Sequence, residues 1–251
     1  MGSRNSIRRN IRKNIPAYDE SPVDTAAVFA RTFGRVLAVI IALSIPFGML
    51  LAGLNISCKL PDLYSFDLNR TGAAKSIGYT DKNEKIADFM AGYMRHKTDS
   101  FILRAKKDGE TVSVFTNGDA QAMRKYRNAL DVSAGALYAL LPVSFAGYLI
   151  LCLLGRKTAL KYSIRAALIV YLGSAVAFGS VMLSKSNSAA FAADIIGVSY
   201  ERGDVLPHLF SGGLFAEIFA LAVGISALAM FLIFALTARL TRDRAMFVRA
   251  Y

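Results

Sequence analysis

Residues 55–131, NISCKLPDLYSFDLNRTGAAKSIGYTDKNEKIADFMAGYMRHKTDSFILRAKKDGETVSVFTNGDAQAMRKYRNALD, decide the fold. They form the only long polar segment that lies between two apolar runs, residues 36–54 and 132–154. Each run is long enough to cross a hydrocarbon core about 30 Å thick, which takes roughly 20 helical residues. We therefore expect the polar segment to be held at a membrane surface by a span on either side.

Two further apolar runs, residues 166–183 and 214–238, complete the pattern. Of the 251 residues, 54% are hydrophobic, and Glu217 is the only formal charge within the four runs. A soluble helix bundle would show polar residues at helical spacing on one face of each helix, and these runs do not. The sequence therefore predicts an all-α membrane protein built on a bundle of four transmembrane helices.

The basic residues indicate which side of the membrane each segment faces. With a cytoplasmic N-terminus, the inner segments hold 15 of the 30 Lys and Arg in 59 residues, and the outer segments hold 15 in 107 residues with 13 acidic residues. The short loop 155–165 has four basic residues and no acidic one. Because short cytoplasmic loops are enriched in Lys and Arg, both termini are predicted in the cytoplasm of a plasma-membrane protein. The net charge of +12 then favours membrane lipids as partners over nucleic acid.

The predicted organisation follows from these spans. In chain order it comprises a basic cytoplasmic segment (1–35), the first span (36–54), an extracytoplasmic cap (55–131), the second span (132–154), a cytoplasmic loop (155–165), the third span (166–183), an extracytoplasmic loop (184–213), the fourth span (214–238) and a cytoplasmic tail (239–251).

Within the cap, the pattern predicts two helices and a hairpin. Residues 59–64 are typical of an extended linker, and a helix is expected from Thr80 to about Met94. Two β-prone runs around an Asp-Gly pair at 108–109 indicate a β-hairpin. A further helix is expected to start near Asn117 or Asp119 and to run directly into the second span. The result is a small α+β cap that rests on the bundle, because about 75 residues are marginal as an independent domain.

Few residues can carry chemistry. Glu217 lies inside a span, where a carboxylate is a functional-site hypothesis by default, although it could reach the head groups from the first turn. His208 follows Asp204 by four residues, so that carboxylate could orient the imidazole; the alternative is an interfacial side chain at the start of the fourth span. Asp119 is expected near the outer surface. The sequence has neither the Cys/His spacing of a metal site nor a nucleotide-binding motif, and no cofactor is predicted.

Two stretches resemble a known family. Residues 115–127, FTNGDAQAMRKYR, look like a Phe-x-Glu-Arg-Glu-x-x-His-Met-x-Asp-Val-Lys stretch, with Phe115, Asp119, Met123 and Arg127 on its Phe, second Glu, Met and final basic positions. Residues 204–210, DVLPHLF, look like an Asp-x-x-Ile-x-x-Phe run that leads into a last span. With four spans, a cap after the first and a basic inner loop, the chain resembles the lipoprotein intramolecular transacylase (Lit) family over residues 30–240.

The resemblance implies a bacterial membrane protein that moves an acyl chain of a lipoprotein from its diacylglyceryl group to its N-terminal amine. This reaction needs a base and a group that stabilises an oxyanion. The two histidines of the family fall on Ala122 and near Ser188, so neither is present here. His208 is the only imidazole that could substitute. The candidate catalytic residues are therefore Asp119, Ser188, His208 and Glu217.

Three functions remain open at this point. The first is acyl transfer at the outer leaflet with altered or lost catalytic groups. The second is a non-catalytic binding or accessory protein whose cap engages a lipid, a lipoprotein or a partner membrane protein. The third is a transmitter of the exporter-permease kind, which ranks last because the loop 155–165 is too short for a long coupling helix. Whether the protein is an enzyme is left open by the sequence.

Overall fold

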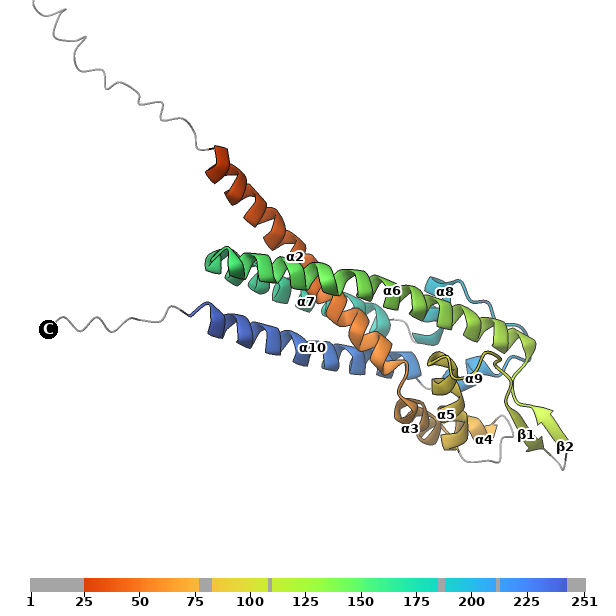
Figure 1. The fold of residues 1–251 in the computed structure, drawn as a ribbon. Helices are drawn as coiled ribbons and strands as arrows, with labels where there is room; N and C mark the ends of the chain where they lie inside the picture. Colours follow the sequence, from red (N-terminus) through yellow and green to blue (C-terminus); the bar gives the residue numbers. More distant parts are fainter. Residues whose placement is uncertain (1–24, 77–82, 108–109, 185–187, 211–212, 243–251) are drawn as a thin grey trace, which may run out of the picture.

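The computed structural model describes residues 25–76, 83–107, 110–184, 188–210 and 213–242. Four long helices run along the molecule, and the shorter elements gather at one end of them (Figure 1). In chain order the elements are α2 (Thr25–Ser57), α3 (Pro61–Thr71), α4 (Ala73–Ser76), α5 (Asn83–Met94), β1 (Arg104–Lys107), β2 (Glu110–Ser113), α6 (Asn117–Leu153), α7 (Lys157–Ser184), α8 (Ser188–Ile196), α9 (Leu206–Phe210) and α10 (Leu214–Leu240).

The four long helices are long and apolar enough to cross a membrane. Their candidate spans are Val28–Ser57, Asn117–Leu153, Lys157–Val181 and Leu214–Leu240. Large apolar side chains are exposed on their outer faces, among them Val132, Phe145, Ile169 and Leu232, each at least 60% exposed. Such surfaces are not tolerated over this extent in water, whereas lipid tails cover them without cost. The prediction of a multi-pass membrane protein is confirmed.

Helix α2 lies at the centre of the bundle and packs against α6, α7 and α10 (Figure 1). At Gly53 it approaches α10 so closely that a Cβ atom would lie 2.3 Å from the carbonyl oxygen of Ala222. On its other side, the hydroxyl of Ser144 in α6 donates to the hydroxyl of Ser44 at 2.8 Å. Small residues that allow close backbone approach, together with hydrogen bonds between helices, are the usual means of association in lipid.

Two hydrophobic clusters stabilise the fold. One lies among the long helices and includes Ile41 of α2, Leu151 of α6, Ile164 of α7 and Met230 of α10. The other joins α3, α5, α8 and α9 to the first turns of α6 and α10. We call α3, α4, α5, β1, β2, α8 and α9 the head region. Because the head region shares its core with the ends of two long helices, it packs on the bundle rather than forming a separate core.

Two predictions for the segment between the first two spans are confirmed. Strands β1 and β2 pair antiparallel, with Arg104 opposite Ser113 and Lys107 opposite Glu110, on either side of residues 108–109. Helix α6 begins at Asn117 and continues without interruption through the predicted second span. The helix expected from Thr80 is α5, which is described from Asn83 and ends at Met94 as predicted.

One local prediction is wrong, and two of the predicted loops are partly helical. Residues 59–64, expected to be extended, run into α3, because Pro61 suits the first turn of a helix and Asp62 interacts favourably with its dipole. Helix α7 begins at Lys157, so most of the predicted loop 155–165 is helical and only residues 154–156 link α6 to α7. The basic side chains of this segment are therefore displayed on the end of a helix. The predicted outer loop 184–213 likewise contains α8 and α9.

The described ends of the chain, at the start of α2 and the end of α10, lie at the end of the bundle opposite the head region (Figure 1). The rest of the predicted basic segment, residues 1–24, and of the tail, residues 243–251, lie outside the described residues. The assignment of the two ends to the cytoplasm and the outer surface, the exact span boundaries, and the cap as a distinct α+β unit stay predictions.

Candidate functional site

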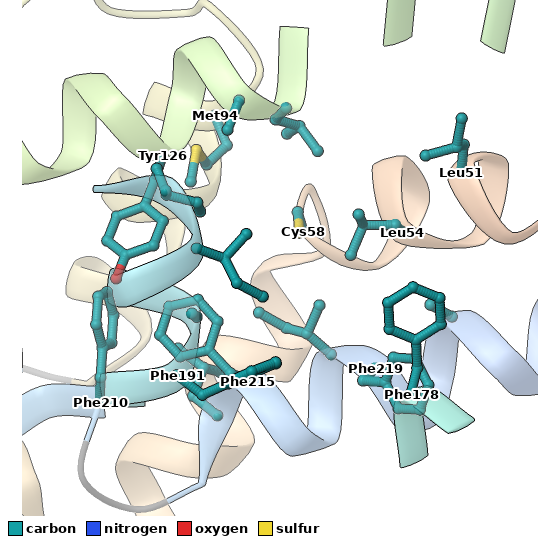
Figure 2. Close-up of a pocket in the computed structure, with 18 of the residues that line it drawn as sticks. Leu51, Leu54, Cys58, Met94, Tyr126, Phe178, Phe191, Phe210, Phe215 and Phe219 are labelled. Atoms are coloured by element: carbon teal, nitrogen blue, oxygen red, sulfur yellow. The ribbon is translucent and has the colours of Figure 1, made fainter. Parts of the chain in front are cut away.

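A cavity of about 390 Å³ lies where the long helices meet the head region (Figure 2). Its walls come from the long helices α2, α6, α7 and α10 and from residues of α3, α5, α8 and α9. The lining is almost wholly apolar, as Leu51, Met123, Phe191, Phe215 and Phe219 illustrate. Within the described part of the chain, no Asp, Glu, Lys, Arg or His side chain lines it. Such a cavity suits a hydrocarbon chain and repels a charged group.

The rim of the cavity includes apolar side chains that are themselves exposed. Phe47 of α2, Phe178 of α7 and Ile195 of α8 line the cavity and are 42%, 49% and 65% exposed, respectively. Phe47 and Phe178 lie within candidate spans, so their exposed faces meet hydrocarbon in a membrane. The cavity is thus bordered by surface that lipid tails can cover.

The few polar atoms on the cavity wall already have partners or are inert. The hydroxyl of Tyr64 donates to the carbonyl oxygen of Cys58 at 2.7 Å, and the hydroxyls of Tyr126 and Tyr200 lie 2.9 Å apart. Burial raises the pKa of the Cys58 thiol to about 12. A thiol that stays protonated at neutral pH is a poor nucleophile, so the cavity wall offers no ready catalytic group.

Asp119 does not line the cavity but joins two helices. It is fully buried, and its carboxylate accepts hydrogen bonds from the backbone N–H groups of Thr116 (2.9 Å), Val205 (3.0 Å) and Leu206 (2.9 Å). The Thr116 hydroxyl in turn accepts from the Asp119 N–H at 3.0 Å, which completes a capping box at the start of α6. The carboxylate therefore ties the first turn of α6 to the first turn of α9.

Asp204 belongs to the same junction. The hydroxyl of Thr116 donates to its Oδ1 at 2.5 Å, and the N–H of Glu201 donates to its Oδ2 at 2.7 Å. The sequence suggested that Asp204 orients the imidazole of His208. In the structure its oxygens accept the hydrogen bonds of Thr116 and Glu201, and its role toward His208 stays a prediction. His208 itself is exposed on α9, two residues before Phe210, which lines the cavity.

Glu217 forms part of a charged bridge between α3 and α10. Arg70 Nη2 lies 2.9 Å from Oδ1 of Asp67 and 2.7 Å from Oε1 of Glu217. Asp67 is 1% exposed, and burial raises the pKa of its carboxyl group while Arg70 opposes that shift. This bridge fastens the head region to the start of the last long helix. The sequence singled out Glu217 but missed Arg70, because residues about 150 positions apart show no pairing signal.

The resemblance to the Lit family would put its two histidines at Ala122 and near Ser188, and both of these residues are buried. Ala122 of α6 is 3% exposed, and Ser188, the first residue of α8, is 7% exposed. Ala122 packs in the same core as Ala189 and Ala192 of α8. The structure does not place Asp119, Ser188, His208 and Glu217 together on the cavity wall, and their catalytic roles stay predictions.

Sequence reasoning missed the cavity itself. In a span, an apolar side chain that lines a cavity has the same composition signal as one that faces lipid. The aromatic residues Phe210, Phe215 and Phe219 near the start of α10 give the one hint, since all three line the cavity. Among the described residues, no three His, Cys, Asp or Glu side chains lie close enough to hold a metal ion.

Comparison with known proteins gives a match in structure and none in sequence. No family profile and no curated protein sequence matches the chain. Among solved structures, it is similar to the membrane integral lipoprotein intramolecular transacylase Lit from Bacillus cereus. A variant of Lit with one histidine changed to arginine has a TM-score of 0.66 at 12% identity, covering 86% of this chain and 95% of that one.

Two further structures of Lit agree. A variant with the histidine changed to alanine has a TM-score of 0.64 at 12% identity and covers 86% of this chain and 96% of that one. A third structure has a TM-score of 0.59 at 13% identity and covers 83% and 97%, respectively. The resemblance inferred from residues 115–127 and 204–210 is thus confirmed at the level of the fold.

Proposed function

We propose that this protein is a multi-pass plasma-membrane protein that holds an acyl chain of a membrane lipid or a lipoprotein in its apolar cavity. The observation that carries the proposal is the charge-free lining of a cavity of about 390 Å³, whose rim merges with lipid-facing side chains. This volume lies within the roughly 300–1,000 Å³ of small-molecule pockets. Each methylene buried from water contributes about 0.8 kcal/mol, so a lipid released into water would return to the cavity or the bilayer.

The proposal places the head region, as a small α+β cap, at the outer leaflet and both termini in the cytoplasm. The support is the distribution of basic residues: Arg156, Lys157, Lys161 and Arg165 cluster around the turn between α6 and α7, with no acidic residue among residues 155–165. This turn lies at the end of the bundle opposite the head region (Figure 1). A cavity next to the head region would then open at the outer leaflet.

Binding without acyl transfer is the function that the site supports best. Ala122 and Ser188 occupy the positions of the family histidines, and both are buried in helix packing. Asp119 is committed to three backbone N–H groups, and Glu217 is paired with Arg70. Among the residues that the structure describes, none lines the cavity as a base that could deprotonate an amine.

Acyl transfer is the second candidate, and one observation besides the fold favours it. His208 is exposed on α9 only two residues from Phe210, which lines the cavity. In this candidate, the imidazole of His208 is the base. His208→Ala should then abolish the reaction.

Lipid binding is tested by filling the cavity. Ala192 lines it from α8, so Ala192→Phe places a ring inside, whereas Ala177→Phe adds the same ring on an exposed position of α7. After purification in mild detergent, native mass spectrometry should detect lipid bound to the wild type and to the Ala177→Phe variant, with a clear loss in Ala192→Phe. Equal lipid retention in all three proteins would contradict the proposal.

Acyl transfer is tested on the lipoprotein itself. The wild type and His208→Ala are each expressed in a host that makes diacylglyceryl lipoproteins, and N-terminal lipopeptides are weighed and fragmented. Binding alone predicts that no acyl chain moves to the N-terminal amine with either protein. A transferred chain that depends on His208 would establish the enzymatic candidate instead.

A further inference from the structure

A group of basic side chains lies directly beside the cavity, at the end of the bundle that bears the head region. Two basic residues directly follow cavity-lining residues in the sequence: Lys59 after the end of α2 and Arg95 after the end of α5. The acidic residue Asp131 does the same within α6. Arg95 Nε donates to the carbonyl oxygen of Lys59 at 2.6 Å, and His96 Nε2 lies 2.9 Å from Oδ1 of Asp131. Three separate elements therefore bring charged residues to one border of the cavity.

Arg127 extends this group along α6, one turn before Asp131. Its guanidinium lies over the ring of Tyr93, 4.2 Å from the centroid, and Nη1 donates to the carbonyl oxygen of Thr98 at 3.2 Å. The ring and the carbonyl hold the guanidinium in one orientation. Its Nε atom is buried and, within the described residues, lacks a hydrogen-bond partner. Because Nε is buried, a ligand can reach this guanidinium only at its outer nitrogens.

We call Lys59, Arg95, His96 and Arg127 the basic rim. Within the basic rim, His96 pairs with the carboxylate of Asp131. Among the residues that the structure describes, Lys59, Arg95 and Arg127 form no ion pair. The basic rim therefore carries uncompensated positive charge next to a hydrocarbon-lined cavity.

The distribution of unsatisfied polar atoms points to the same place. Of the four buried side-chain atoms without a hydrogen-bond partner in the described part of the chain, one belongs to Arg127, and two belong to Asn55 and Ser57. The latter two lie in the last turn of α2, within four residues of Lys59. Buried polar atoms in native proteins are usually satisfied. Arg127 Nε and the Ser57 hydroxyl are hydrogen-bond donors, the kind of group that an anionic ligand pairs with, whereas Asn55 Oδ1 can only accept a hydrogen bond, so it does not bear on a phosphate.

We propose that the basic rim binds the phosphate group of a phospholipid whose acyl chain occupies the cavity. Arginine suits this role because its planar guanidinium donates two parallel hydrogen bonds to phosphate oxygens. A phospholipid joins a phosphate to an acyl chain through a glycerol of a few atoms, which matches basic residues that adjoin the cavity lining. The inference rests on the proposed acyl-chain site and adds the chemical class of its head group.

The test compares two lipids that differ only in the phosphate. Phosphatidic acid and diacylglycerol with the same acyl chains are titrated onto the full-length protein in mild detergent, and bound lipid is counted by native mass spectrometry. The wild type should bind phosphatidic acid about tenfold more tightly than diacylglycerol, the worth of one charge-assisted hydrogen bond to a phosphate. Inorganic phosphate at millimolar concentration should not displace the lipid.

Variants assign the preference to the basic rim. Arg95→Gln and Arg127→Gln should each remove most of the preference while leaving diacylglycerol binding unchanged, which also reports that the variants are folded. Arg127→Lys should retain part of it. Arg202→Gln, which removes an exposed charge from the turn before α9, is the matched control and should behave as the wild type.

Each outcome bears on one of the two claims. Equal binding of both lipids by the wild type, or an undiminished preference in both Gln variants, would overturn the phosphate site and leave the acyl-chain site standing. Displacement of phosphatidic acid by inorganic phosphate would make the rim a site for a soluble phosphate and overturn the lipid assignment. Failure to bind either lipid would refute the acyl-chain site and, with it, this inference.

Discussion

Asp119 exemplifies a residue whose type suggests chemistry and whose surroundings indicate a structural role. Its carboxylate is inaccessible to solvent and accepts hydrogen bonds from three backbone N–H groups on two segments 86 positions apart. All of its contacts serve the ends of α6 and α9. A buried carboxylate in such a position stabilises the fold strongly, because its removal leaves several backbone donors unsatisfied.

We predict that Asp119→Ala lowers the free energy of unfolding by about 2–4 kcal/mol, because three buried N–H groups lose their acceptor. Thermal unfolding in detergent measures this as a lower Tm. The control is Asp88→Ala on the exposed face of α5, which should leave Tm nearly unchanged. If the two variants unfold at the same temperature, the structural role assigned to Asp119 is wrong.

Local sequence patterns could predict only half of this junction. Thr116 and Asp119 form a capping box that marks a helix start, and α6 begins there. Val205 and Leu206, which supply the other two donors, carry no signal in their side chains because they contribute backbone atoms. The partner of Glu217 was missed for a different reason: Arg70 pairs with it through its side chain, but the two residues lie about 150 positions apart in the sequence.

At the scale of elements, α2 and α10 approach each other closely where they cross at Gly53. A methyl group on Gly53 would lie 2.3 Å from the carbonyl oxygen of Ala222, which cannot move without displacing the helix backbone. Gly34, on the same helix, has no neighbouring atom within 4 Å of the equivalent position. Substituting alanine at both positions therefore distinguishes the effect of helix packing from the effect of helix propensity.

Gly53→Ala should destabilise the protein by at least about 2 kcal/mol, since overpacking forces the two helices apart. Gly34→Ala should be neutral or slightly stabilising, because Ala is the better helix former. Thermal unfolding of both variants in one detergent gives the comparison. Equal Tm values would show that the two helices do not cross at Gly53.

The bridge from α3 to α10 has a predictable dependence on pH. Burial raises the pKa of Asp67, so the folded protein favours its protonated form, and the contribution of this group to stability falls as pH rises through that pKa. Arg70 offsets the penalty only when the carboxylate is charged. Arg70→Gln should therefore lower Tm more at pH 7 than at pH 5, relative to the wild type at each pH.

The control for this prediction is Lys75→Gln, which removes an exposed cation from the neighbouring helix α4. It should shift Tm little and by the same amount at both pH values. An Arg70→Gln effect that is independent of pH would mean that Asp67 does not depend on Arg70 for its charged form.

At the scale of the whole molecule, composition predicts the architecture and not the cavity. Four charge-poor runs of sufficient length must cross a membrane as helices, so the bundle follows from the sequence. The 390 Å³ cavity depends on where α8 and α10 meet α2 and α6, and their facing side chains differ in no way from those that meet lipid. Helix α3 and the start of α7 at Lys157 were not predicted either. In both segments the polar composition outweighed the local helix signals, at Pro61 and at Lys157.

The predicted orientation in the membrane can be tested by labelling. In a background without Cys58 and Cys152, single cysteines are introduced as Lys75→Cys in the head region and Lys161→Cys near the opposite turn; both positions are exposed. A membrane-impermeant maleimide applied to intact cells should label the first and spare the second until the membrane is opened. The reverse labelling pattern would show that the head region faces the cytoplasm, contrary to the predicted topology.

The acyl-chain site is tested most directly by a lipid that carries a photoactivatable diazirine at the end of its acyl chain. After reconstitution and irradiation, peptide mapping by mass spectrometry locates the crosslinks. The account predicts adducts on cavity-lining residues such as Met94, Met123 and Phe215, and their loss in Ala192→Phe. Adducts confined to lipid-facing residues such as Phe145 and Leu232, and unchanged by that substitution, would contradict it.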